Sequence, residues 1–364
     1  MSKLFLTPYF CEQEVLYRKA VSPAANKWLL HITTAVLKLE KVEVLGHLPE
    51  PLWPKGEITP VCLISNKTEK TQSLYYLNAP FLKSVSLFLS YLVALTRLFI
   101  KFPSEEYYVI TYNPSNAIQK LIRLFRLKRK LTWVSIVADG DAPSKADGLI
   151  FLSYGYYKAH PMMNAKKMHL DGALYKNLAS VDTQMKASKT VLMYSGTSSK
   201  WGGVSYLLDA YLKACKNVEL ELWISGAGDY SQFSKQYSHE PSIKFLGMLS
   251  QSELEERYKQ ADIFVNPRPE LYDNDKNFPS KLFDYLSYGK PVISFKTSGL
   301  SPQYDDLLIF PDQNSVKALA NSIKEVINWT DHERQLYASK LDHYASTVTW
   351  DVQAKRFLQF VESL

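Results

Sequence analysis

Residues 277–293, with the sequence NFPSKLFDYLSYGKPVI, constrain the fold of this chain more than any other stretch. Pro279 suits the first turn of a helix but not its interior, and Ser280 is a residue type that caps a helix N-terminus. Three apolar residues then recur at helical spacing and are predicted to face a core: Leu282, Phe283 and Leu286. Gly289 is typical of a helix end, and the apolar residues from Pro291 onward predict a buried strand.

The start of this predicted helix is suited to an anion. A helix that begins near Ser280 directs free backbone N–H groups and the positive end of its dipole at the preceding loop. Lys281 and Asp284 are predicted to lie on the polar side of the helix, where a ligand or water can reach them. A helix followed by a strand occurs in any α/β protein, so these residues alone leave a purely structural role open.

The same residues resemble the nucleotide-sugar-binding segment of retaining glycosyltransferases of family 4, in particular their exopolysaccharide and capsule members, which have the GT-B fold. The resemblance implies that Asp284, where the family usually has glutamate, hydrogen-bonds the ribose of the nucleotide. It also implies that Pro279 leads into the diphosphate site, where Ser280, Lys281 and the helix start meet the phosphates.

The loop before the helix departs from the family pattern. Many members carry two spaced glutamates there, but neither Lys276 nor Asn277 is acidic, and Asp273 and Asp275 are out of step. The donor sugar is therefore predicted to be held by Asn277 and by backbone N–H groups around Phe278.

A glycine-bearing loop provides a second candidate phosphate site. Gly196 and Thr197 follow a predicted buried strand and precede a predicted helix, and backbone can approach a phosphate closely where a side chain is absent. The family usually has basic residues at the positions of Thr197 and Gly202. Because neither is basic here, Lys200 and Lys281 are predicted to balance the diphosphate charge. The resemblance implies that further turns line the nucleotide, with the residues Gly226, Gly228, Met248 and Leu249. Ser250 or Ser252 is predicted to cap a helix over residues 251–260.

Strands and helices alternate along the chain, which predicts parallel sheets covered by helices. At 364 residues the chain is too long for one ordinary core. We expect a GT-B fold of the α/β class, with two Rossmann-like, doubly wound parallel-sheet domains facing across a cleft. The expected parts are an N-terminal acceptor-binding domain (1–185), a C-terminal nucleotide-sugar-binding domain (186–345) and a C-terminal helix that crosses back to the N-terminal domain (346–364). The polar stretch 171–188 predicts the linker.

Charge and cysteine usage limit the partners and the compartment. The net charge is +7 and residues 121–130 form the densest basic run, which favours phosphate-bearing substrates or an anionic membrane surface; no nucleic-acid partner is predicted. Cys11, Cys62 and Cys215 have no metal or redox spacing, and the start of the chain has no signal-peptide pattern. These features indicate the cytoplasm.

Residues 81–101 form the most apolar stretch of the chain. Thirteen residues lie between Lys83 and Arg97, whereas about 20 are needed to cross a bilayer. We therefore expect a buried or membrane-contacting helix of the first domain, with peripheral contact at the inner face of the membrane.

The acidic pair in Asp139-Gly140-Asp141 leaves several interpretations open. Such a pair holds a divalent cation in the other large glycosyltransferase architecture, GT-A, although no other mark of that fold is present. Acids at the carboxyl end of a parallel strand lie at the ligand crevice, so Asp139 is predicted to contact the acceptor or donor sugar. A turn-forming Asp-Gly pair explains the residues equally well. His160 and His169 stand in sequence predicted to be irregular and have no metal spacing, and neither a metal nor a cofactor is predicted.

The sequence thus predicts an enzyme that transfers a sugar, with retention, from a nucleoside-diphosphate sugar to a glycan or lipid-linked acceptor in cell-surface polysaccharide synthesis, with UDP as the favoured nucleotide. Positive charge at the helix start and on the two lysines is predicted to stabilise the departing diphosphate. Two alternatives remain open. One is a catalytically inactive binding or scaffold subunit, which the absent basic pair favours, and the other is a GT-B sugar-nucleotide epimerase.

Overall fold

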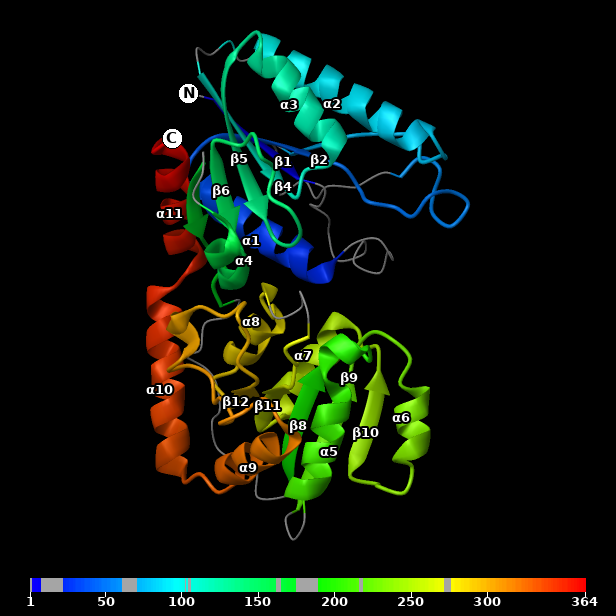
Figure 1. Cartoon of the computed structure of the whole chain (residues 1–364), viewed down its shortest axis with the longest axis vertical. Coiled ribbons are helices and arrows are strands. Elements are labelled where there is room, and N and C mark those ends of the chain that lie inside the picture. Colours follow the sequence, from blue (N-terminus) through cyan, green and yellow to red (C-terminus); the bar gives the residue numbers. More distant parts are fainter. Residues whose placement is uncertain are drawn as a thin grey trace. The chain divides into compact units, whose positions relative to one another are not determined.

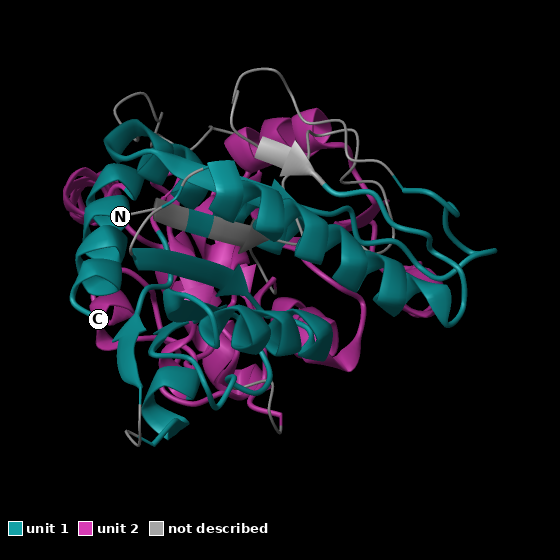
Figure 2. Cartoon of the chain, turned by 90° about the horizontal axis from the view of Figure 1, so that it is seen from above, with its two compact units in different colours: residues 1–152, 156–172, 350–364 teal, residues 153–155, 173–349 magenta. Residues whose placement is uncertain are grey.

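The structure is a computed structural model and describes residues 2–7, 22–60, 71–101, 103, 106–161, 165–174, 189–215, 219–271 and 276–364. Cys11, Cys62, Asp273, Asp275 and the predicted linker after residue 174 lie outside the described residues. The chain divides into two compact units, drawn in separate colours in Figure 2. Unit 1 contains residues 1–152, 156–172 and 350–364, and unit 2 contains residues 153–155 and 173–349.

Unit 1 is built on a parallel sheet with the strand order β3-β2-β1-β4-β5-β6-β7 (Figure 1). Its strands are β1 (Ser2–Thr7), β2 (Val42–Gly46), β3 (Thr71–Ser73), β4 (Glu106–Tyr112), β5 (Lys130–Val137), β6 (Gly148–Phe151) and β7 (Lys166–His169). Its helices are α1 (Pro23–Leu39), α2 (Leu82–Lys101), α3 (Asn116–Arg126) and α11 (Trp350–Glu362), and α4 (Tyr154–Ala159) is shared between the units.

Side chains alternate along the strands of unit 1 and build a core on each face of the sheet. Tyr107 and Val109 of β4 pack in one cluster with α2 and α3, whereas Tyr108 and Ile110 pack in the other with α1 and α11. The alternation of strands and helices that the sequence predicts is confirmed in this unit. His169, which the sequence placed in an irregular segment, instead ends the edge strand β7.

Unit 2 is built on a second parallel sheet with the order β10-β9-β8-β11-β12. Its strands are β8 (Thr190–Ser195), β9 (Leu220–Ser225), β10 (Ile243–Gly247), β11 (Ile263–Asn266) and β12 (Val292–Ser294). Its helices are α5 (Val204–Ala214), α6 (Ser231–Gln236), α7 (Gln251–Gln260), α8 (Lys281–Leu286), α9 (Val316–Ile327) and α10 (Asp331–Thr347). Helices α5 and α9 pack on one face of this sheet, and α8 and α10 pack on the other.

The C-terminal helix α11 packs against α1 within unit 1. Trp350 contacts Trp28 edge to face with 6.1 Å between ring centroids, and the Gln353 side-chain amide donates a hydrogen bond to Gly172 O at 2.6 Å. Asp171 O accepts a hydrogen bond from the Trp28 indole at 2.9 Å. Asp171 and Gly172 are therefore buried parts of unit 1, and the prediction of a polar linker beginning at residue 171 is wrong.

Candidate functional site

The strand order of unit 2 reverses between β8 and β11. The chain places β9 and β10 on one side of β8 and then crosses to place β11 and β12 on the other. In such sheets ligands bind outside the carboxyl ends of the strands at this switch point. Four loops lie at those strand ends, and we name them loop A (196–203), loop B (226–228), loop C (247–249, which includes Gly247 at the end of β10) and loop D (267–271).

Loops A, B and C are joined through their backbones. The bonds are Gly196 N–H to Ser225 O (2.9 Å), Ser198 N–H to Ala227 O (3.0 Å) and Gly226 N–H to Gly247 O (2.9 Å). Gly226 has φ +127°, and a Cβ there would lie 1.8 Å from Gly196 O. Gly226 therefore permits the close approach of loops A and B. The structure thus brings four residues predicted from sequence into adjoining loops: Gly196, Thr197, Gly226 and Gly228.

The remaining predicted residues of this edge, Met248 and Leu249, are in loop C, which directly follows β10. Met248 is 71% exposed and Leu249 is half-buried. The predicted helix that follows is confirmed as α7, which has a capping box between Ser250 and Glu253.

Tyr285 ties α8 to the end of β8. Its buried hydroxyl accepts a hydrogen bond from Ser195 N at 2.8 Å and donates one to Ser195 O at 3.0 Å. Strands β8 and β11 pair at Leu192 and Met193, and this pairing does not extend to Ser195. At Ser195 the tyrosine hydroxyl therefore satisfies the backbone groups that face β11. Burial raises the pKa of Tyr285, so the hydroxyl stays protonated and can donate.

Asp284 lies beside this tether. Burial raises the pKa of both Tyr258 and Tyr285, and the negative charge of Asp284 raises it further in each. The carboxylate is therefore held near the end of β8, on a side chain that is half-buried. The prediction that Leu282, Phe283 and Leu286 face a core is confirmed.

The prediction that Ser280 caps α8 is wrong. Its backbone is already helical (φ −56°, ψ −19°), and its side chain makes no capping hydrogen bond. A capping serine needs extended backbone to turn its hydroxyl toward the first N–H groups, and here Leu282 N–H donates to Pro279 O at 3.0 Å instead. The helix also has only six residues, so its dipole supplies less positive charge than the sequence suggested. Lys281, at the start of α8, is half-buried.

The loop that leads into α8 is packed into the core. The Phe278 ring lies 4.8 Å from the Phe283 ring and 5.5 Å from the Tyr304 ring, and Pro279 is buried. Phe278 and Pro279 therefore fix the loop. Asn277 differs, because its buried Oδ1 has no hydrogen-bond partner among the described residues.

Gly202 explains why loop A lacks a lysine at the family's usual position. A Cβ on Gly202 would lie 2.2 Å from Thr197 O and 2.4 Å from the Tyr194 hydroxyl, so no side chain fits this arrangement. Lys200, the predicted substitute, is exposed, and its Nζ lies 4.7 Å from the centroid of the Trp201 ring. This is a cation–π contact between neighbouring residues of loop A.

Arg268 is a candidate that the sequence reasoning missed. It is in loop D, whose Pro267 carbonyl oxygen would lie 1.9 Å from a Cβ on Gly203, so loops A and D are in contact. The Tyr194 hydroxyl donates a hydrogen bond to Thr197 O at 3.0 Å. Burial is the largest effect on the pKa of Tyr194 and raises it, and the charge of Arg268 also acts on this pKa. Arg268 therefore brings a guanidinium group to loop A. A basic residue directly after a predicted buried strand is the signal that could have identified it.

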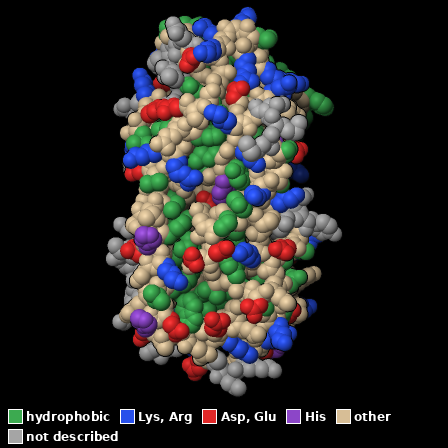
Figure 3. All heavy atoms as spheres, turned by 60° about the vertical axis from the view of Figure 1, so that its left-hand side comes forward, with side chains coloured by type: hydrophobic (Ala, Val, Ile, Leu, Met, Phe, Trp, Pro, Cys, Tyr) green, Lys and Arg blue, Asp and Glu red, His purple; other side chains and the backbone are tan. Residues whose placement is uncertain are grey.

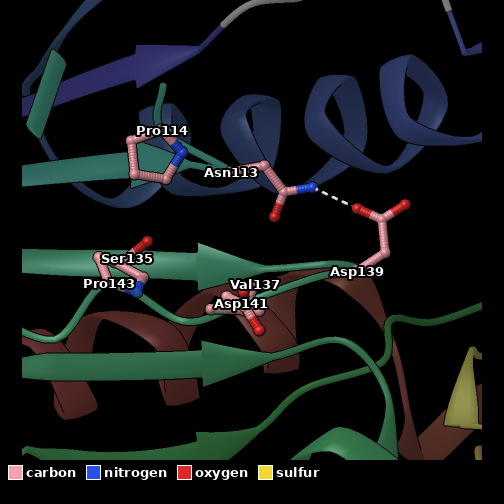
Figure 4. Close-up of a pocket in the computed structure, with 7 residues that line it drawn as sticks. All are labelled: Asn113, Pro114, Ser135, Val137, Asp139, Asp141 and Pro143. Atoms are coloured by element: carbon pink, nitrogen blue, oxygen red, sulfur yellow. Dashed lines mark hydrogen bonds between the residues drawn. The ribbon is translucent and has the colours of Figure 1, made fainter. Parts of the chain in front are cut away.

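Unit 1 has a polar pocket at the carboxyl ends of β4 and β5, with a volume of about 240 Å³ (Figure 4). Asp139 lines it and accepts a hydrogen bond from the Asn113 side-chain amide at 2.7 Å. Asn113 has φ +39° and accepts from Ala138 N–H at 3.0 Å, so it joins the ends of the two strands. The buried Ser135 hydroxyl also lines the pocket and has no hydrogen-bond partner among the described residues.

Among the residues that the structure describes, no three His, Cys, Asp or Glu side chains are grouped to hold a metal ion. Asp139 and Asp141 both line the pocket of unit 1, and Asp139 is engaged by Asn113.

Two α/β units, each with a parallel sheet, form the GT-B fold, as the sequence predicted, and solved glycosyltransferases share this fold over the whole chain. Sucrose-phosphate synthase from Thermosynechococcus elongatus is 13% identical with a TM-score of 0.70, covering 100% of this chain and 99% of its own. A glycosyltransferase from Rickettsia africae is 12% identical with a TM-score of 0.68, covering 100% and 98%. HepE from Anabaena is 15% identical with a TM-score of 0.64, covering 100% of both chains.

Residues 189–328, most of unit 2, match the family model described as Glycosyl transferases group 1. No curated protein sequence matches the chain. The family match and the shared fold together indicate that the chain is a glycosyltransferase.

Proposed function

We propose that this protein transfers a sugar, with retention, from a nucleoside-diphosphate sugar to a glycan or lipid-linked acceptor in the synthesis of a cell-surface polysaccharide. The observation that carries the proposal is the junction of loops A, B and D at the switch point of unit 2, with two basic side chains, Lys281 and Arg268, at the same edge. UDP is the favoured nucleotide. HepE was solved with UDP and glucose, and the pneumococcal O-GlcNAc transferase GtfA with UDP and GlcNAc.

In this proposal each group of the edge has one task. Backbone N–H groups of loop A, Arg268 and Lys281 bind the diphosphate, because a guanidinium group donates two parallel hydrogen bonds to phosphate oxygens. Asp284 accepts a hydrogen bond from the ribose, and backbone at Met248 contacts the base. The buried Oδ1 of Asn277 accepts from a hydroxyl of the donor sugar, which supplies the partner that this oxygen lacks among the described residues.

The proposed chemistry is electrostatic. The bond between the anomeric carbon and the diphosphate oxygen breaks while the acceptor hydroxyl oxygen bonds to the same carbon from the same face. The acceptor proton passes to the departing diphosphate, so the reaction requires no separate protein base. Arg268 and Lys281 stabilise the negative charge that develops on the leaving group. The donor is a substrate, and the proposal includes neither a cofactor nor a metal.

We assign acceptor recognition to the pocket of unit 1. Asp139 and the Ser135 hydroxyl provide a charged acceptor and a buried hydroxyl in one small cavity, a combination that suits the hydroxyl groups of a sugar. The proposed location is the cytoplasm, at the inner face of the membrane.

A catalytically inactive binding subunit is the alternative to be tested, because positions 197 and 202 lack the family's basic residues. Calorimetry with UDP and GDP measures donor binding, and donor hydrolysis over several sugars measures turnover. Asp284→Ala should weaken UDP binding by about tenfold or more, the worth of a hydrogen bond to a charged group. Lys281→Ala should lower turnover more than binding, since its charge matters most in the transition state.

Asp342→Ala, an exposed carboxylate of α10, is the matched control and should change neither quantity. Unchanged UDP affinity in Asp284→Ala would count against the proposed site. UDP binding without turnover on any donor would identify the inactive subunit.

A further inference from the structure

Helix α2 presents an apolar row to solvent. Figure 1 shows α2 at the edge of unit 1 with α3 beside it. The exposed row recurs at helical spacing along the length of α2 and consists of Leu82, Val85, Leu89, Val93 and Ile100, which are between 47% and 72% exposed. Phe81, directly before the helix, is 96% exposed. A soluble surface helix normally carries polar residues at such positions, so this row requires an explanation.

The opposite side of α2 is committed to the core of unit 1. Tyr91, Leu95 and Leu98 are buried in one cluster with Trp133 and Val109 of the sheet. Among the described residues, α2 is the one helix whose length and apolar composition would allow it to cross a membrane, and its mean hydropathy is 1.5. Crossing would remove the buried side chains from that cluster, whereas lying flat on a membrane leaves them in place. The helix is therefore suited to the surface of a bilayer and not to its interior.

The charges carried by α2 and α3 themselves have one sign. Neither α2 nor α3 contains an acidic residue, and Arg97 and Arg123 are exposed beside the apolar positions. Leu124 and Leu127 of the α3 end are also exposed, at 46% and 81%. Unit 1 has 24 Lys and Arg against 15 Asp and Glu, whereas unit 2 has 19 against 21. On the face drawn in Figure 3, which includes α10 and α11, both signs of charge are interspersed.

We propose that the outer face of α2, together with the end of α3, binds the surface of an anionic lipid bilayer. The apolar row of α2 enters the boundary between headgroups and acyl chains, and the basic side chains contact lipid phosphates. A flat acidic surface contacts all positions of a straight row about 30 Å long at once, which a smaller partner does not. This inference depends on α2 and α3 alone and stands independently of the donor site.

The test is flotation of the full-length protein with vesicles, without any nucleotide. Vesicles of equal parts phosphatidylcholine and phosphatidylglycerol should bind the protein, vesicles of phosphatidylcholine alone should bind it weakly, and added salt should release it. The double variant Leu89→Gln with Val93→Gln should lower binding about tenfold, because two side chains lose their apolar contact with the acyl chains. Arg97→Gln with Arg123→Gln should lower binding to the anionic vesicles by a similar factor.

Leu336→Gln is the matched control, because Leu336 is 54% exposed on α10 and lies in unit 2. It should bind vesicles as the wild type does. Failure of the wild type to float with anionic vesicles overturns the proposal, as does equal binding of the Leu89/Val93 variant. If that variant instead converts a dimer to a monomer in light scattering and the wild type does not float, the face binds a second copy and the proposal is wrong.

Discussion

The hydroxyl of Tyr285 offers a direct test of how the donor site is held together. Tyr285→Phe removes one oxygen from a fully buried ring and leaves Ser195 N–H and Ser195 C=O without the partner they have now. Each buried backbone group left unsatisfied costs about 1–3 kcal/mol. Partial relaxation of the strand end reduces the sum, so we expect a loss of about 2–4 kcal/mol in the unfolding free energy of unit 2.

The same variant should weaken nucleotide binding. Ser195 is the last residue of β8, and loop A begins at the next residue, so the lost hydrogen bonds loosen the backbone that the proposal assigns to the diphosphate. Urea denaturation followed by tryptophan fluorescence measures the stability, and calorimetry with UDP measures the affinity. We expect UDP affinity to fall about tenfold, since ordering the loop again on binding opposes association.

Tyr337→Phe separates the two effects. The Tyr337 hydroxyl also makes two buried hydrogen bonds, accepting from Val292 N at 3.2 Å and donating to Leu307 O at 2.6 Å, but Val292 begins β12 at the edge opposite the loops. It should lose comparable stability and keep its UDP affinity. Equal UDP affinities in the two variants, or an unfolding free energy of Tyr285→Phe equal to that of the wild type, would refute the reasoning.

Arg268→Gln should weaken UDP binding about tenfold to a hundredfold and leave uridine binding unchanged, because the guanidinium group is assigned to the phosphates; equal loss for both ligands in calorimetry would contradict this. Burial, aided by the charge of Lys83, lowers the pKa of His47 from its ordinary 6.5 to about 4. The unfolded chain therefore binds a proton between these values that the folded chain does not, and stability should fall by about 3 kcal/mol as the pH drops from 6.5 to 4. His47→Gln should flatten that part of the stability–pH curve measured by denaturation, and an unchanged curve would show that His47 is not its source.

Local sequence signals predicted the parts of the site that depend on local structure. The core-facing positions of α8 follow from helical spacing. Ser250, one of the two serines predicted to cap α7, is the cap, and a capping serine needs only residues of its own turn. The parallel sheets followed from the alternation of apolar strands and helices, since each parallel strand needs a crossover helix, and the GT-B fold followed from the family resemblance of residues 277–293.

The features that were missed depend on contacts between distant segments. Ser280 is a residue type that caps helices. The loop before it is fixed by packing of Phe278 against Tyr304, and the backbone of Ser280 is already helical. The apolar composition of residues 81–101 likewise predicted a helix that is either buried or in contact with a membrane, and it could not distinguish these two possibilities. Only the packing of unit 1 shows that α2 has one apolar side in the core and another toward solvent.

The location of positive charge in the donor site follows from the strand order of unit 2. Strands β8 and β11 are neighbours at the switch point, so a basic residue after either one reaches the same edge of the sheet. After β8, Gly202 must stay small because the Thr197 carbonyl and the Tyr194 hydroxyl occupy the space of a side chain. After β11, Arg268 has no such restriction and acts on the same Tyr194 hydroxyl. In the proposed function, Arg268 of loop D therefore supplies the charge that position 202 of loop A lacks, and the glycine at that position does not by itself argue for an inactive site.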